Sequence, residues 1–183
     1  MITGRCRFNI YLMLSLAALL FAGCKSTDRD KPKKEDKTKL LSTLRIHVEV
    51  TAAPMDFSVK VPVSRTNPMM VTVDKDPFLT EGNVAAAKVV EAMGGYDIQV
   101  EFDHSGTLLL EQYTTSNPGR RMAIFSLFGK TKEESRWLAA PTVGRRITNG
   151  KLTFTPDASR EEAERIVLGL TNFARKNQEN NKW

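Results

Sequence analysis

Three neighbouring carboxylates and two histidines are the first residues of this sequence to consider for acid–base chemistry. Asp97, Glu101 and Asp103 lie close together, and His104 follows the last of them directly. A carboxylate paired with an imidazole can move protons in a hydrolase if a hydroxyl nucleophile joins them in a pocket. However, Asp97 and Glu101 alternate with apolar residues, which places both on the outward face of a predicted strand. We expect His47 and His104 to be isolated surface residues, in a strand and a turn respectively.

Catalytic and ligand-binding motifs give no support for an enzyme. The sequence lacks a nucleophile elbow, the zinc-protease motif, a phosphate-binding loop and a dinucleotide fingerprint. Both cysteines, Cys6 and Cys24, lie in the N-terminal segment, so neither a disulfide framework nor a thiolate metal site is expected in the body. We therefore predict no catalytic residues, no metal site and no cofactor. An envelope hydrolase of unknown substrate remains an alternative.

The first residues have the organisation of a secretory leader. Arg5 and Arg7 supply a positive start, and residues 10–22 form a mostly apolar run of 13 residues. A membrane-spanning helix needs about 20 such residues. A secretory leader needs only about 7 to 15. The length therefore predicts a signal peptide over residues 1–23.

Lipidation of Cys24 is the chemistry that the end of this run predicts. Phe21, Ala22 and Gly23 precede Cys24, which resembles the lipobox of bacterial lipoproteins, although Phe21 stands where leucine is usual. In that family the cysteine receives a diacylglyceryl group and becomes the mature N-terminus after cleavage. The resemblance implies a membrane anchor through Cys24, in the inner or outer membrane of the cell envelope, with the body facing the periplasm. An ordinary signal peptide with an incidental cysteine is the alternative.

The charge of the chain is concentrated near its N-terminus. The sequence has 27 basic and 21 acidic residues, and the excess lies mainly in Arg5, Arg7 and residues 25–39. Because that stretch mixes both charges and lacks apolar periodicity, residues 24–42 are predicted to be a disordered, lipid-anchored tether. The remaining body is nearly neutral and lacks a large cluster of basic residues. Nucleic acid is therefore not an expected partner.

Alternating apolar residues predict strands over residues 44–50, 57–63, 69–73 and 96–102. The first two, within residues 44–64, are joined by a short loop and form a predicted N-terminal β-hairpin extension, and Pro62 places the second at a sheet edge. Helical spacing of apolar residues from Thr80 to Met93 predicts a helix that Gly94 ends. A short helix is expected over residues 108–113, with its cap in residues 103–107.

The last third of the chain carries the strongest local signals. Strands are predicted over residues 122–125, 137–141, 143–147 and 152–154. Asn149 and Gly150 predict a type I′ hairpin turn that joins the last two strands. A helix should begin at Ser159, whose capping box includes Glu162. Together these elements predict one α+β domain over residues 43–178, with helices on one face of a mostly antiparallel sheet, followed by a tail of residues 179–183.

Residues 69–175 resemble the head subdomain of the first periplasmic domain of SecD, a bacterial membrane protein that assists export. The similarity runs through residues 77–80, 98–102, 114–124, 138–141, 147–150 and 159–163. It implies a ferredoxin-like α+β sandwich and an ability to contact unfolded or partner polypeptide. SecD also has several transmembrane helices that couple proton flow to substrate movement. We expect no spanning segment after Cys24 here, and hence no such motor.

Aromatic residues that flank a charged connector, residues 129–136, form the predicted contact surface for a partner. The candidate residues are Phe125, Phe128, Trp137 and Leu138. The alternative is that Phe125 and Leu138 are core residues and that Trp137 covers them. The sequence thus predicts a non-catalytic module that binds unfolded polypeptide, a translocase or another envelope-complex protein. A structural spacer in an envelope complex is the other alternative.

Overall fold

The computed structural model describes residues 39–51, 56–129 and 134–180. Contacts divide the chain into Met1–Lys34 and Glu35–Trp183, and every described residue belongs to the second unit. The predicted signal peptide, the predicted lipidation site Cys24 and most of the predicted tether lie outside the described residues. Within the described ranges, no helix has the length and apolar character needed to span a bilayer.

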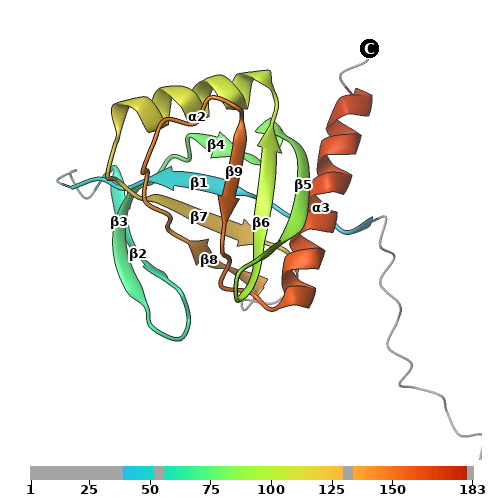
Figure 1. The fold of residues 1–183 in the computed structure, drawn as a ribbon, viewed down its shortest axis with the longest axis horizontal. Helices are drawn as coiled ribbons and strands as arrows, with labels where there is room; N and C mark the ends of the chain where they lie inside the picture. The colour runs from blue at the N-terminus through green and yellow to red at the C-terminus, as the bar shows by residue number, and fades with distance from the viewer. Residues whose placement is uncertain (1–38, 52–55, 130–133, 181–183) are drawn as a thin grey trace, which may run out of the picture. The chain divides into compact units, whose positions relative to one another are not determined.

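The described chain has an α+β fold, as predicted, and its sheets are antiparallel (Figure 1). One sheet has the order β4-β1-β7-β8, a second has the order β5-β6-β9, and β2 and β3 form a separate pair. The strands are β1 (Arg45–Val48), β2 (Ser58–Val63), β3 (Met69–Asp74), β4 (Leu79–Thr80), β5 (Val84–Ala92), β6 (Gly95–Phe102), β7 (Met122–Leu127), β8 (Ser135–Ala139) and β9 (Lys151–Phe154). The helices are the 3-10 turn η3 (Glu81–Asn83), α2 (His104–Ser116) and α3 (Arg160–Asn180).

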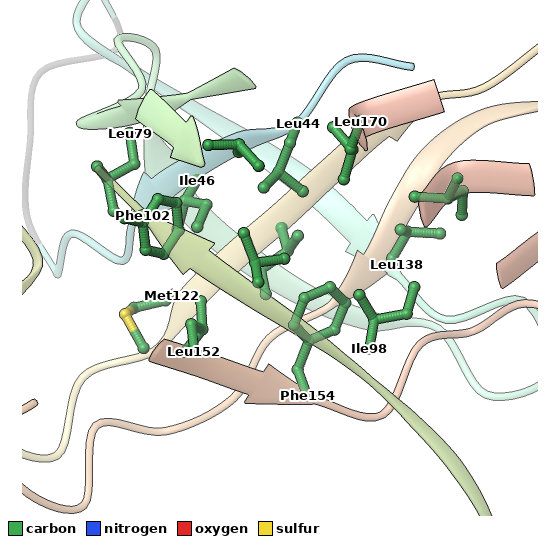
Figure 2. Close-up of a cluster of buried hydrophobic side chains, with 14 of the residues drawn as sticks. Leu44, Ile46, Leu79, Ile98, Phe102, Met122, Leu138, Leu152, Phe154 and Leu170 are labelled. Carbon is green, nitrogen blue, oxygen red and sulfur yellow. The ribbon is translucent and has the colours of Figure 1, made fainter. Parts of the chain in front are cut away.

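The main hydrophobic core combines the four-stranded sheet, the three-stranded sheet and both α-helices. Ile98, Val100 and Phe102 of β6 are buried in it, as the alternation of that strand predicts. Figure 2 shows side chains of both sheets gathered in one cluster with Leu170 of α3. Burial of each large aliphatic side chain contributes about 1.5–3 kcal/mol, so this cluster is the principal source of stability.

Helix α3 begins with the predicted capping box. The Glu162 N–H donates to Ser159 Oγ at 3.2 Å, and the Ser159 N–H donates to the Glu162 carboxylate at 2.7 Å. These reciprocal bonds satisfy two main-chain donors that no helical carbonyl can reach. The helix start is therefore set by the local sequence.

The packed body extends further towards the N-terminus than predicted. A Cβ on Gly169 of α3 would lie 2.2 Å from Ser42 Oγ, so glycine is required for this close approach. Ser42 is buried, and Asn172 Nδ2 donates to the Leu40 carbonyl at 3.0 Å. Residues 40–42 therefore lie on α3 and do not belong to the tether.

The predicted helix from Thr80 to Met93 is wrong. Thr80 does cap a helical turn by accepting the Gly82 N–H, but the turn is only η3. The chain then continues as β5, which pairs with β6 through a turn at Gly94, where φ is 85°. An irregularity between Val84 and Ala86 shifts the alternation of β5. That shift made a strand resemble helical spacing.

The predicted hairpin at Asn149 and Gly150 is also wrong, because residues 143–147 form no strand and β9 pairs with β6. A type I′ turn needs positive φ at both central residues. Gly150 has a φ of 65°, but Asn149 does not have a positive φ. In the described ranges, Ser64 is the one non-glycine residue with a positive φ. Gly150 instead permits a close approach to α2, since a Cβ there would lie 2.2 Å from Thr107 Oγ1.

The β-hairpin extension exists, but it consists of β2 and β3, because β1 pairs with β4 and β7. Pro62 lies on β2, and this pair has only edge strands, in agreement with its predicted position. The inner face of the hairpin packs on Ala123 of β7 and on the partly buried Trp137 and Ala140. The buried hairpin residues are Val61, Val63, Val71 and Val73. Both faces of the four-stranded sheet are thus covered.

Candidate functional site

The structure divides the four predicted contact residues between the two faces of the four-stranded sheet. Phe128 and Leu138 are each 1% exposed and belong to the main core. They therefore offer no contact surface, in line with the core alternative for Leu138. Phe125 and Trp137 are half-buried on the opposite face, and their rings meet edge to face at 5.4 Å. Only these two can belong to an exposed patch.

His47 lies beneath the hairpin, and its predicted surface position is wrong. Its side chain is buried, its ring meets Trp137 edge to face at 5.1 Å, and its Nδ1 lies 2.8 Å from the Asp74 carbonyl oxygen. Because a carbonyl can only accept, Nδ1 carries the proton. Burial lowers the pKa of His47, and the bond to Asp74 opposes this only in part.

A charged network holds the tip of the β2–β3 hairpin on the body. The Arg65 N–H donates to the Asp157 carboxylate at 2.8 Å, and the Arg65 guanidinium lies 3.2 Å from it. Arg136 of β8 donates to the Asp157 carbonyl at 3.1 Å and to the Glu162 carboxylate at 2.6 Å. Burial raises the pKa of Glu162, but the bonds from Ser159 and Arg136 outweigh it, and the net shift is downward.

The predicted acid–base residues do not form a common site. Asp97 accepts a hydrogen bond from the Thr155 hydroxyl at 2.6 Å, and Glu101 lies 2.5 Å from Lys151 in an ion pair. Asp103 is the N-cap of α2 and accepts a main-chain N–H at 2.6 Å. Each carboxylate thus has a separate structural partner.

The second histidine, His104, also belongs to no group of described side chains suited to acid–base or metal chemistry. His104 is exposed in the first turn of α2. Across residues 39–51, 56–129 and 134–180, no three histidine, cysteine, aspartate or glutamate residues are grouped as a metal site would require.

A groove of about 840 Å³ lies between residues 141–149 and strand β9. Thr142 forms an antiparallel bridge with Arg121, which anchors the first part of this wall to the chain before β7. The Ile147 N–H donates to Thr114 of α2 at 3.0 Å, which anchors the second part. Sequence analysis missed the groove because it assigned residues 143–147 to a strand paired with β9.

Strand β9 presents a free main-chain edge to this groove. The Phe102 N–H of β6 donates to the Gly150 carbonyl at 2.9 Å. From this pair onwards, each residue of β9 lies opposite the preceding residue of β6, so that Lys151 faces Glu101 and Leu152 faces Val100. Hydrogen-bonded and non-hydrogen-bonded pairs alternate along an antiparallel ladder. Leu152 therefore bonds to β6, whereas the main-chain groups of Lys151 and Thr153 point away from it. Both residues line the groove.

The groove is basic at its rim and apolar at its base. Arg145, Arg146 and Lys151 line it, together with the buried side chains of Met122 and Leu152. The last two lie near one another in Figure 2. This combination of cations, apolar surface and open main-chain groups suits the binding of an extended polypeptide.

Comparisons with known proteins identify the family. The model of the SecDF P1 head subdomain matches residues 58–173. A structure of SecDF, described as a membrane component that enhances protein export, is 17% identical with a TM-score of 0.51. The similarity covers 94% of this chain and 71% of that one.

Two further SecDF structures are similar at 16% identity. One is in a super-membrane-facing form, with a TM-score of 0.45 and coverage of 90% of this chain and 33% of that one. The other, from Thermus thermophilus, has a TM-score of 0.39 and coverage of 91% and 34%. No curated protein matches the chain. Because the family model spans more than half of the sequence, the chain belongs to the SecDF P1 head subdomain family.

Proposed function

We propose that this protein is a lipid-anchored accessory factor of protein export that binds polypeptide at the cell envelope and does not modify it. Family membership supports the connection with export, since the related SecDF is described as enhancing that process. The observation that carries the binding role is the free edge of β9 in a groove, because unpaired main-chain donors and acceptors can pair with the main chain of an extended polypeptide.

Exposed apolar side chains on the hairpin add to this binding surface. Phe57 is 66% exposed, Met70 is 49% exposed and Val59 is 41% exposed. Unfolded polypeptides expose apolar side chains that folded proteins bury, so such a surface favours the unfolded form. The structural bonds of Asp97, Glu101 and Asp103 also favour binding over catalysis.

The proposed anchor is a lipid on Cys24. Several acyl chains on one cysteine, each buried CH₂ contributing about 0.8 kcal/mol, would hold the body beside the membrane. Labelling of cells with an alkyne fatty acid tests this. We expect label on the wild type and on Cys6→Ala, which retains Cys24, and none on Cys24→Ala. Equal labelling of the two variants would contradict the assignment.

Site-specific photocrosslinking in intact cells tests the binding role. A photoreactive residue is placed at Met70 on the hairpin or at Thr153 in the groove, with Lys176, exposed near the end of α3, as the matched control. We expect Met70, Thr153 or both to trap many newly exported polypeptides, and Lys176 to trap few. Capture of one constant folded protein from all three positions would support the spacer alternative. An absence of exported polypeptides from every position would refute the proposal.

A further inference from the structure

We propose that β9 is a docking strand for an extended acidic segment of polypeptide, which adds to its free edge as a further β-strand. This inference rests on the proposed function and names both the place of binding and the class of segment bound. The segment would lie in the groove, between β9 and the wall of residues 141–149.

The main-chain groups at this edge have few internal partners. The Lys151 N–H donates to Asn149 Oδ1 at 3.1 Å. The Lys151 carbonyl and both main-chain groups of Thr153 remain directed towards the groove. Among the described residues, no main-chain bond joins them to residues 141–149. An added strand would supply partners for them at every second residue.

The facing wall leaves the edge open because its own main chain is used elsewhere. The Pro141 carbonyl accepts the Met122 N–H at 2.9 Å, and the Val143 N–H donates to the Arg120 carbonyl at 2.8 Å. These bonds extend the antiparallel contact between β7 and the chain that follows β8. Residues 141–143 thus form a fixed wall beside β9 and do not pair with it.

The charge of the groove selects an acidic segment. Arg146 forms an ion pair with Glu111, and Lys151 forms one with Glu101. Arg145 is exposed, lines the groove and has no carboxylate partner among the residues that the structure describes. One uncompensated positive charge therefore remains, and the residues that line the groove include no carboxylate. An acidic side chain would complement it, and apolar neighbours would contact the base.

The main-chain part of the proposal is tested with two substitutions at one residue. Thr153→Pro removes the N–H that faces the groove, and proline is tolerated at a strand edge. Thr153→Val keeps that N–H and only replaces the hydroxyl with a methyl group. The probe is a fluorescent peptide in which glutamate and valine alternate, titrated against the full-length chain in detergent. We expect binding about three- to ten-fold weaker for Thr153→Pro and nearly unchanged for Thr153→Val.

A change in the peptide provides a test that does not depend on folding of a variant. Methylation of alternate amide nitrogens of the probe removes the donors of one edge and leaves its side chains intact. We expect one of the two methylated registers to abolish binding to the wild-type chain. Equal binding of the unmodified peptide and both methylated registers would overturn strand addition.

The charge part is tested with Arg145→Gln and, as a matched control, Lys176→Gln on α3. We expect Arg145→Gln to weaken binding of the glutamate–valine peptide about two- to five-fold and Lys176→Gln to leave it unchanged. A lysine–valine peptide should bind more weakly than the acidic one. Equal binding of the two peptides, or full competition by inorganic phosphate at millimolar concentration, would overturn selection of an acidic polypeptide.

The inference can fail while the proposed function stands. Unfolded polypeptide could still crosslink to Met70 while the affinity for the peptide is unchanged by Thr153→Pro and by Arg145→Gln. In that case the binding site lies on the hairpin and β9 is not the docking strand. If neither unfolded polypeptide nor the peptide binds, both proposals fail together.

Discussion

Arg65 and Asp157, which are 92 residues apart, are joined by both main-chain and side-chain bonds. The Arg65 N–H donates to Asp157 Oδ2 at 2.8 Å, and the guanidinium Nε lies 3.2 Å from the same oxygen. This contact fixes the tip of the β2–β3 hairpin beside the start of α3. The hairpin is therefore held on the body by this contact at its tip, in addition to the packing of its strands on the four-stranded sheet.

Asp157→Ala should loosen the hairpin without unfolding the core. The substitution removes the acceptor of both Arg65 donors, and we expect a loss of about 1 kcal/mol in the free energy of unfolding, because the Arg65 side chain is more than half exposed. Amide hydrogen exchange at residues 61–73 should accelerate. Unchanged exchange there, with Arg65→Ala showing the same result, would show that the tip contact does not hold the hairpin.

His47 should make stability depend on pH below about 7. Its folded-state pKa lies below its unfolded value of 6.5. The unfolded chain therefore binds more protons in this range, and stability falls as pH decreases. His47→Gln can keep a donor towards Asp74 but cannot titrate, so its unfolding free energy should vary less.

Denaturant unfolding at several pH values measures this dependence. The control is His104→Gln, since His104 is the other histidine of the sequence and is exposed. It should retain the pH dependence of the wild type. If His47→Gln and the wild type lose equal stability between pH 7 and pH 5, His47 is not the group responsible.

Gly150→Ala should be strongly destabilising, whereas Gly144→Ala should be nearly neutral. An alanine at residue 150 would combine an unfavourable φ of 65° with a Cβ 2.2 Å from Thr107 Oγ1. We expect a loss of at least about 1–3 kcal/mol, measured by chemical unfolding. Gly144 lies in the same loop, has no positive φ and has open space at its Cβ position. Equal stability of the two variants would contradict the packing of Gly150 against α2.

Trp137→Ala and Phe57→Ala should separate packing from binding. Trp137 contacts Phe125, His47 and the hairpin, so its loss should cost about 3–5 kcal/mol of stability. Phe57 is mostly exposed, so its loss should change stability little but weaken capture of unfolded polypeptide several-fold. Stable Trp137→Ala with impaired capture would instead support the predicted aromatic patch.

Some short-range signals in the sequence predicted local structure correctly, whereas the helical spacing from Thr80 to Met93 did not. The capping box of Ser159 and Glu162 marked the start of α3, and the alternation of Ile98, Val100 and Phe102 marked the buried face of β6. The contacts that set the start of α3 are local in sequence. The buried face of β6 follows from the two-residue period of a strand. Physical chemistry within one element was sufficient there.

Long-range pairing was the part that the sequence did not reveal. Asn149 and Gly150 carry the usual residue types of a hairpin turn, but β9 pairs with β6, whose partner residues lie about 50 positions earlier. His47 stands on the polar face of β1, and nothing nearby in the sequence indicates that β2 and β3 cover it. The groove depends on the same long-range pairing, so its residues could not be grouped in advance.

Equilibrium binding of one polypeptide in two states tests the central claim most directly. A secretory protein is prepared with intact disulfides, and again after reduction and alkylation so that it stays unfolded, and each form is titrated against the full-length chain in detergent. We predict that only the unfolded form binds, and that its mass is unchanged after prolonged incubation. Equal binding of both forms, binding of neither, or cleavage of the polypeptide would contradict a protein that binds extended chains without modifying them.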